Sequence, residues 1–198
     1  IYTLYLSSAA SDVYKRQALH RVTPLLVGAK TLAYAANMQA QRHAKAAGCD
    51  DALLVRADDQ VVLEGPTSAF AWIEDGKLVF PPLEVGVLDS LTRRIAMDAV
   101  PSTTREATTA ELASADGAFL LSTVMEAVPV SEVMGLARFD PEAPAVTGAR
   151  HAIEAAIAEH VVEVCWAGRR SPWTGAAPRR TAPRRGRSRW ASSGSGPA

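Results

Sequence analysis

The sequence of 198 residues lacks several features that mark common classes of protein. It has only two cysteines, Cys49 and Cys165, which are far apart and form no C-x-x-C pair. This usage suits a reduced, cytoplasmic protein better than a disulfide scaffold. No run reaches the ~20 apolar residues of a membrane-spanning helix, and we expect no signal peptide because no basic segment precedes a long apolar run.

Several chemical motifs are also absent. There is no G-x-G-x-x-G, no G-x-S-x-G and no P-loop lysine motif. The four histidines show no spacing that would hold zinc; they are His20, His43, His151 and His160. We therefore expect no metal site, and His43 is expected on a solvated helix face.

Acidic residues are missing from the last part of the chain. From Trp166 to Ala198 there are eight of the 21 basic residues, all of them arginine, and no Asp, Glu or Lys. The preceding 165 residues thus carry 13 basic and 21 acidic residues. Residues 166–198 are rich in Arg, Pro, Ala, Gly and Ser, which predicts a disordered tail. A nucleic-acid-binding arm is one interpretation, and a frameshift in GC-rich DNA is the stronger one, so we do not expect a nucleic-acid partner.

The first 17 residues show no helical or strand period. The segment 8–17 resembles a translated sequencing adapter, so we interpret residues 1–17 as a non-native leader and leave them out of the fold prediction. Residues 18–165 then form the protein proper, without internal repeats.

Within residues 18–165 the pattern predicts a mixed α/β domain of short strands, hairpins and packed helices. The segment 31–47 is expected to be a helix with Leu32, Ala36, Ala40 and Ala44 on one face, ended by Gly48. Glu74–Lys77 is a strong hairpin turn, and Ser90 is a plausible N-cap. The predicted elements are strands at 52–55, 61–63, 70–73, 78–80, 118–121 and 128–133, and helices at 31–47, 90–99 and 147–164.

Four groups of residues could carry chemistry. Lys30 lies at a predicted junction of loop and helix, where partial desolvation would favour a neutral amine nucleophile. Glu64 follows an apolar strand, where a buried carboxylate needs a cationic partner such as a protonated pyridine nitrogen. The helix that starts after Ser90 offers backbone amides to an anion, and Thr123 ends a strand. Each signal is weak alone, since ordinary surface lysines, turn glutamates and capped helices look the same.

Together, in this chain order, the groups resemble the large domain of the class IV, fold-type IV family of enzymes that use pyridoxal 5′-phosphate (PLP). The shared pattern is Lys-x-x-x-Tyr, a strand, Glu-Gly-x-x-Ser, a hairpin, Pro-Pro-Leu, Leu-Thr-Arg, and Ser-Thr-x-x-Glu-x-x-Pro-Val, over about residues 25–135. The family includes branched-chain and D-amino-acid aminotransferases and aminodeoxychorismate lyase. The resemblance implies the large PLP-binding domain of the D-amino-acid-aminotransferase-like fold.

The resemblance also implies a role for each matching residue. Lys30 would form the Schiff base with PLP and move the proton, and Tyr34 would hydrogen-bond the phenolic oxygen of the cofactor. Glu64 would pair with the pyridinium nitrogen. The cofactor phosphate would be held by Leu91, Thr92 and Thr123.

Three functions stay open. The first is amino transfer between an amino acid, branched-chain-like, and a 2-oxo acid, by a cytoplasmic protein that is a homodimer when intact. The second is aminodeoxychorismate lyase, which yields 4-aminobenzoate for folate synthesis. The third is an inactive remnant, or a protein that binds a partner through its Arg-rich tail.

The sequence departs from the family pattern at three positions: Ala33, Ala69 and Ser90 stand where Asn, Asn and Gly are usual. No catalytic group is lost, although Ala69 puts one local hydrogen bond in doubt. Few residues precede Lys30, so we expect the small N-terminal domain of the family to be missing from the chain.

Overall fold

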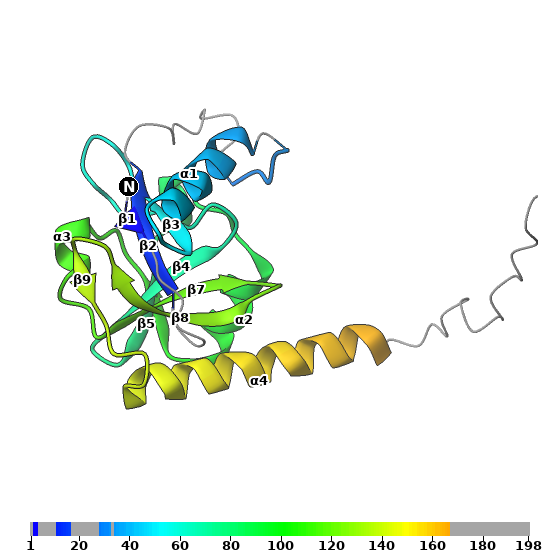
Figure 1. The fold of residues 1–198 in the computed structure, drawn as a ribbon. Helices are drawn as coiled ribbons and strands as arrows, with labels where there is room; N and C mark the ends of the chain where they lie inside the picture. The colour runs from blue at the N-terminus through cyan, green and yellow to red at the C-terminus, as the bar shows by residue number, and fades with distance from the viewer. Residues whose placement is uncertain (1, 4–10, 17–27, 33, 167–198) are drawn as a thin grey trace, which may run out of the picture. The chain divides into compact units, whose positions relative to one another are not determined.

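The computed structural model describes residues 2–3, 11–16, 28–32 and 34–166, with side chains described for 28–32 and 34–160. Within these residues nine strands form one sheet, in the order β1-β3-β2-β8-β7-β4-β5-β6, with β9 paired to β8. The pairs β2–β3, β2–β8 and β5–β6 are parallel, while the remaining pairs are antiparallel. Figure 1 shows α4 running along one side of this sheet and α1 beside β3.

The strands are short and the helices are few. The strands are β1 (Tyr2–Thr3), β2 (Ser11–Arg16), β3 (Asp51–Leu54), β4 (Ala69–Glu74), β5 (Lys77–Phe80), β6 (Ser102–Thr104), β7 (Gly117–Ser122), β8 (Glu126–Val133) and β9 (Ala137–Arg138). The helices are α1 (Ala35–Ala46), the 3-10 turn η2 (Leu83–Val85), α2 (Leu91–Ala99), α3 (Thr109–Leu112) and α4 (Pro144–Trp166).

Both faces of the central strands are buried. Along β4 the side chains alternate, as strand geometry requires: Phe70 and Trp72 belong to one apolar cluster, and Ala71 and Ile73 to another. The second cluster includes Ala96 of α2 and Ile153 of α4, so these two helices cover that face. A third cluster packs Ala40 and Ala44 of α1 against β3. The core therefore holds α2 and the part of α1 from Ala40 to Ala44; both helices flank the candidate site described below.

Most predicted elements are confirmed, including the hairpin. In its turn Asp75 and Gly76 have φ of 50° and 70°, which matches the left-handed pair of a type I′ turn. β5 ends at Phe80 before the two prolines, and Gly48, with φ of 84°, follows the end of α1. The oxygen of Ser90 accepts the amide hydrogen of Arg93 at 3.2 Å, which confirms the N-cap.

Four expectations differ from the structure. The strand predicted at 61–63 is present only as isolated bridges, which pair Val62 with Val55 and Val61 with Thr108. The helix predicted from Thr31 begins at Ala35, and Leu32, expected on its apolar face, is 97% exposed. The helical period of small apolar residues continues before Ala35, but no described side chain packs on that preceding segment. The segment before Ala18, where no element was expected, contributes β1 and β2. β2 pairs with β3 and β8, and β1 pairs with β2 and β3. These pairings use backbone groups, which the residue pattern of the segment does not reveal. β6, α3 and β9 were also not predicted, since each has only two to four residues.

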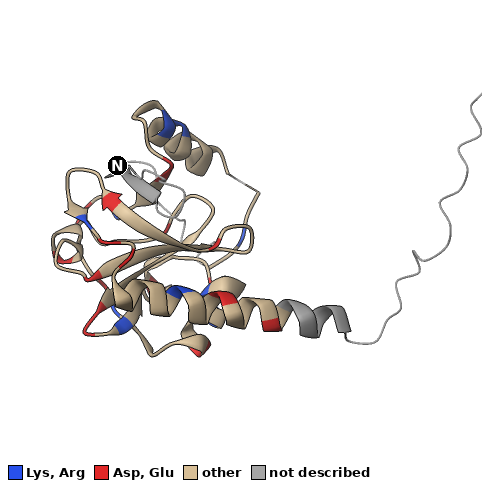
Figure 2. Ribbon diagram, turned by 60° about the horizontal axis from the view of Figure 1, so that its bottom comes forward, with Lys and Arg blue, Asp and Glu red and all other residues tan. Residues whose placement is uncertain are grey.

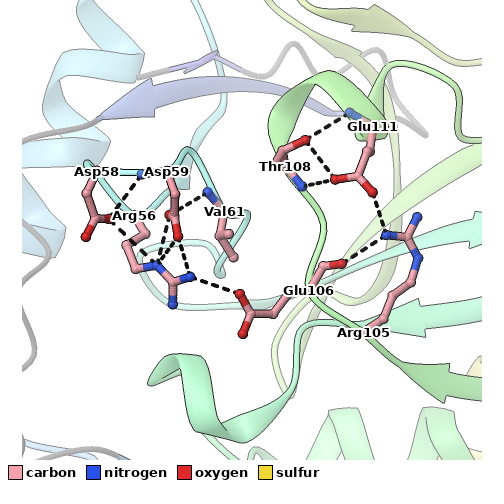
Figure 3. A network of polar contacts seen from close by, with 8 residues as sticks. All are labelled: Arg56, Asp58, Asp59, Val61, Arg105, Glu106, Thr108 and Glu111. Carbon is pink, nitrogen blue, oxygen red and sulfur yellow. Dashed lines mark hydrogen bonds and ion pairs between the residues drawn. The ribbon is translucent and has the colours of Figure 1, made fainter.

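The segments 56–61 and 105–111 are joined by a polar network (Figure 3). Arg56 donates to Asp59 at 2.9 Å and to Glu106 at 2.9 Å. Arg105 donates to Glu111 at 3.1 Å, and Glu111 closes a capping box with Thr108 at the start of α3. The network ties the loop before the Glu64 segment to the loop after β6.

Charge is mixed over the described ribbon, with basic positions scattered among acidic ones (Figure 2). In that part of the chain no helix is both long and apolar enough to cross a membrane, and no group of three or more His, Cys, Asp or Glu could hold a metal ion. Residues Ile1–Cys165 make up one compact unit and Trp166–Ala198 another. The predicted disorder of the tail concerns residues that, after Trp166, lie outside the described ones. The prediction that residues 1–17 are not native stays a prediction.

Candidate cofactor site

One pocket of about 550 Å³ collects all the residues that the sequence singles out. Its lining includes Lys30, Tyr34, Glu64, Leu91, Thr92 and Thr123. These residues come from four separate parts of the chain: the segment before α1, the loop after the 61–63 segment, the start of α2 and the end of β7. The structure therefore brings the whole candidate set to one place.

The lysine lies on an open segment. Residues 28–30 are exposed, and Lys30 is in a loop five residues before α1 rather than at its first turn. The expected partial desolvation of Lys30 is thus wrong for the described structure, because the described side chains leave this segment uncovered. Tyr34, the N-cap of α1, is half-buried and lines the same pocket.

Glu64 is placed by backbone pairing. Its carbonyl accepts the amide hydrogen of Leu54 at 2.8 Å, and the amide of Leu63 donates back to Leu54 at 3.0 Å. This antiparallel pairing with β3 holds the 61–64 segment until the chain turns away at Gly65. The carboxylate consequently stands at the end of a held segment, facing the pocket.

The environment of Glu64 disfavours its charge. Burial raises the pKa of this carboxyl group from 4.5 to about 7, against the opposing effects of a hydrogen bond and of nearby positive charge. The hydrogen bond comes from the amide of Leu88 to Oε2, at 3.0 Å. The charges are Arg93 and Lys30. Oε1 accepts no hydrogen bond from the described residues, so a cationic or N–H ligand in the pocket would find an available acceptor there.

Arg93 is a buried cation that follows Glu64 in the sequence, whereas Lys30 precedes it. Its guanidinium donates to the carbonyl of Pro81 at 2.8 Å and lies 5.2 Å from the centroid of the Phe80 ring. Burial lowers the pKa of this guanidinium, but an arginine side chain keeps its charge in proteins. Arg93 therefore supplies a fixed positive field that favours the ionised form of Glu64.

The turn after Glu64 is tight. The amide of Gly65 donates to the carbonyl of Ser68 at 2.8 Å. A Cβ on Gly65 would lie 2.2 Å from the Ser68 hydroxyl oxygen and 3.3 Å from the Ser68 carbonyl oxygen, so a side chain at position 65 would force Ser68 to shift. The Ser68 hydroxyl is buried and has no hydrogen-bond partner among the described residues.

The start of α2 presents donors to the pocket. The first amides of a helix have no intrahelical acceptor, and the amides of Leu91 and Thr92 are not used by the N-cap, which takes that of Arg93. The partial positive charge of this helix end favours an anion. Thr92 is buried and Leu91 is half exposed. At the other side of the pocket β7 ends at Ser122, and the exposed Thr123 follows.

Two contacts at the pocket were not predicted. The side-chain amide of Asn37 donates to the carbonyl of Pro66 at 2.7 Å, and the amide of Leu88 holds Glu64. The partner of Asn37 is a backbone carbonyl 29 positions away, and the partner of Glu64 is a backbone amide 24 positions away. No pattern of residue types encodes such backbone partners. Asn37 alone carried a signal, since a polar residue of weak helix propensity lies one position from the predicted apolar face.

The set of donors and acceptors fits PLP. A pocket carboxylate with a raised pKa and an unused oxygen suits a protonated ring nitrogen, and unused helix amides suit a phosphate. A primary amine, a phenol and a further hydroxyl line the same space, as Lys30, Tyr34 and Thr123. No residue needed for this assignment lies outside the pocket.

Comparisons with known proteins agree with this chemistry. The model of the amino-transferase class IV family matches residues 2–133. The chain belongs to this family, whose members are PLP-dependent enzymes. No curated protein matches the chain.

Solved structures of the family share the fold. A fold IV-transaminase from Curtobacterium pusillum is 28% identical, with a TM-score of 0.65 over 74% of this chain and 54% of that one. A hypothetical aminotransferase from Mycobacterium tuberculosis, in a PLP-bound form, is 26% identical with a TM-score of 0.69, over 77% and 57%. A branched-chain aminotransferase from the archaeon Thermoproteus uzoniensis, solved with norvaline, is 27% identical with a TM-score of 0.67, over 82% and 56%. The chain spans little more than half the length of these structures.

Proposed function

We propose that this chain is the PLP-binding part of a class IV aminotransferase that moves an amino group between a branched-chain-like amino acid and a 2-oxo acid. The observation that carries the proposal is the convergence of Lys30, Glu64 and the start of α2 on one pocket. In the proposal Lys30 would attach the cofactor, Glu64 would keep its ring nitrogen protonated, and the start of α2 would bind its phosphate. The complete protein is proposed to be a cytoplasmic homodimer, as the family resemblance implies.

Each residue has a defined task in the proposal. Bound PLP supplies the electron sink for the reaction. Lys30 would hold the cofactor through its amine and would move the proton at the substrate Cα. Glu64 would keep the ring nitrogen protonated through its available oxygen. Tyr34 would hydrogen-bond the phenolic oxygen.

The phosphate is the anchor of the cofactor. The amides of Leu91 and Thr92, the Thr92 hydroxyl and the Thr123 hydroxyl are its proposed donors. Asp89, which also lines the pocket, would repel a phosphate, but its charge is paired with Arg94. The pair leaves the positive end of α2 as the dominant local field.

The direct test is cofactor binding by the full chain. PLP is titrated into wild type, Lys30→Ala and Lys77→Ala, and the absorption band at the visible edge is recorded. Lys77 is an exposed lysine at the β4–β5 turn, outside the pocket, and serves as the matched control. We expect the band in wild type and Lys77→Ala and its loss in Lys30→Ala. A band that survives in Lys30→Ala removes Lys30 from the proposed role.

Substrate assays then separate the reactions open to the family. Amino transfer from a branched-chain amino acid to a 2-oxo acid supports the proposal. Release of pyruvate from aminodeoxychorismate, without amino transfer, replaces it by the lyase. Cofactor binding with neither reaction identifies the chain as given as a non-catalytic form.

A further inference from the structure

Among the residues that the structure describes, one side-chain hydrogen bond joins the segment that follows Lys30 to the turn that follows Glu64. The side-chain amide of Asn37, in the first turn of α1, donates to the carbonyl of Pro66 at 2.7 Å. Both residues line the pocket, and both are shielded from solvent in part or in full. Asn37 lies seven positions after Lys30, and Pro66 lies two positions after Glu64. The bond thus joins the segment that carries the amine to the turn that carries the carboxylate.

The other described contacts hold residues 28–37, the segment that carries Lys30, only weakly. α1 packs on β3 through Ala40, at the middle of the helix, and Ala44, in its last turn. Tyr34 at its N-cap makes no side-chain capping hydrogen bond, and Leu32 is 97% exposed. Among the described residues, no other side-chain hydrogen bond links residues 28–37 to residues 64–68. The position of Lys30 relative to Glu64 therefore depends on this contact more than on core packing.

We propose that Asn37 is a positioning residue, which sets the placement of Lys30 relative to Glu64 by tethering the start of α1 to the Pro66 carbonyl. The inference rests on the proposed function for its role in cofactor binding. Asn37 itself has no chemical part in the reaction. Its donor N–H is the feature that matters, because a backbone carbonyl can only accept.

Helix stability alone does not account for an asparagine at this position. Asn is a poorer helix former than Ala, Leu or Gln. Replacing it by Ala or Leu improves the local helix propensity while removing the tether. The two effects offset, so we expect the midpoint of thermal unfolding to change by less than about 3 °C. A large loss of cofactor affinity without a loss of stability would separate positioning from folding.

The first experiment measures PLP affinity in the full chain. Asn37→Ala and Asn37→Leu remove the donor, and Leu keeps the size of the side chain. Loss of one partly buried hydrogen bond predicts PLP binding, followed by the Lys30-dependent band, about fivefold to tenfold weaker in both variants. Asn37→Gln keeps an amide donor and is expected to recover part of the affinity. Arg42→Ala, an exposed change on the same helix, is expected to bind as wild type does.

The second experiment needs no cofactor. Trypsin cleaves after Lys30, and the rate reports how often the segment opens locally. We expect cleavage after Lys30 to be several-fold faster in Asn37→Ala and Asn37→Leu than in wild type, with partial recovery in Asn37→Gln. Cleavage after Lys77, in the β4–β5 turn, is the internal control and should not change.

The outcomes distinguish this inference from the function it builds on. If wild type shows no Lys30-dependent band, the proposed function fails, and the tryptic rates still decide whether Asn37 tethers the segment. If the band forms, but affinity and cleavage after Lys30 are the same in Asn37→Leu as in wild type, the positioning role is overturned. The role is also overturned if Asn37→Gln is no better than Asn37→Leu in both measurements.

Discussion

The backbone amide of Leu88 donates a hydrogen bond of 3.0 Å to Oε2 of Glu64, across 24 positions of the chain. The bond places the loop that follows η2 against the end of the 61–64 segment. It also occupies one carboxylate oxygen, while the other accepts no hydrogen bond from the described residues. The pH behaviour of the site follows from this carboxyl group, which is partly buried and held by only one described hydrogen bond.

Glu64 should make the free protein less stable as the pH rises toward neutral. Its pKa is about 7 in the folded chain against 4.5 ordinarily, so between these values the folded state binds more protons than the unfolded state. The free energy of unfolding then falls with rising pH across that window, by about 3 kcal/mol in order of magnitude. Urea unfolding of the full chain without cofactor, from pH 4.5 to 8, measures the change.

Glu64→Gln is the control for this pH dependence. The substitution removes the titrating group, so the fall in stability between pH 4.5 and 7 should become smaller. Burial also raises the pKa of Asp51 to about 6, and this group is present in both proteins, so its contribution cancels in the difference. Parallel curves for wild type and Glu64→Gln would show that the carboxyl of Glu64 is not perturbed as described.

The turn after Glu64 should tolerate no side chain at position 65. In Gly65→Ala the new Cβ would lie 2.2 Å from the Ser68 hydroxyl oxygen, so we expect a loss of about 1–3 kcal/mol in the free energy of unfolding. Ser68→Ala removes a buried hydroxyl without a described partner and should cost little. The double variant should recover part of the loss, which a double-mutant cycle in urea unfolding measures. Strictly additive effects would contradict the proposed contact.

Two arginines of the Figure 3 network should differ in their contribution to stability. Arg105 donates to both carboxylate oxygens of Glu74, at 2.9 and 2.8 Å, and its guanidinium lies 5.6 Å from the Trp72 ring centroid. Arg105→Lys loses this two-point geometry and should cost about 1–2 kcal/mol. Arg56 also binds both carboxylate oxygens of Asp59, but these carboxylates are exposed and Arg56 has no described ring contact, so Arg56→Lys should cost less than about 1 kcal/mol.

Urea unfolding at low and high salt tests the difference between these arginines. The small contribution of Arg56 should shrink at high salt, because exposed ion pairs are screened. The contribution of Arg105 should persist, since part of it comes from contact with a buried ring. Equal costs for both substitutions, with equal salt dependence, would mean that only charge matters in this network.

The sequence predicted the fold best where structure is decided locally. The Asp75–Gly76 turn needs two left-handed residues in a row, and that requirement is visible in the residues themselves. The start of α1 shows the opposite case. Small apolar residues extend the helical period back to Thr31, yet the helix begins at Ala35, because a period stabilises a helix only where another surface packs on it. No local pattern contains that information.

The candidate site likewise contains residues that the sequence predicted and contacts that it did not. Lys30, Glu64 and Thr92 were predictable because each lies next to the end of an element, where the order of motifs can be read along the chain. The contacts of Asn37 and Leu88 were not, because their partners are a backbone carbonyl and a carboxylate far away in sequence. Sequence order identifies the candidate cofactor-binding groups better than the groups that hold those residues in place.

The start of α2 should recognise the phosphate of PLP and not its ring. Thr92→Val is nearly isosteric and removes only the hydroxyl, at a buried position that tolerates an apolar methyl. Because a hydrogen bond to a charged group contributes about 1.5–3 kcal/mol, we expect PLP binding to weaken by roughly tenfold or more. Pyridoxal, which lacks the phosphate, should bind Thr92→Val as weakly as it binds wild type. Thr103→Val, an exposed change on β6, should leave both affinities unchanged. If Thr92→Val instead weakens PLP and pyridoxal by the same factor, Thr92 supports the pocket as a whole, and the phosphate must be held elsewhere.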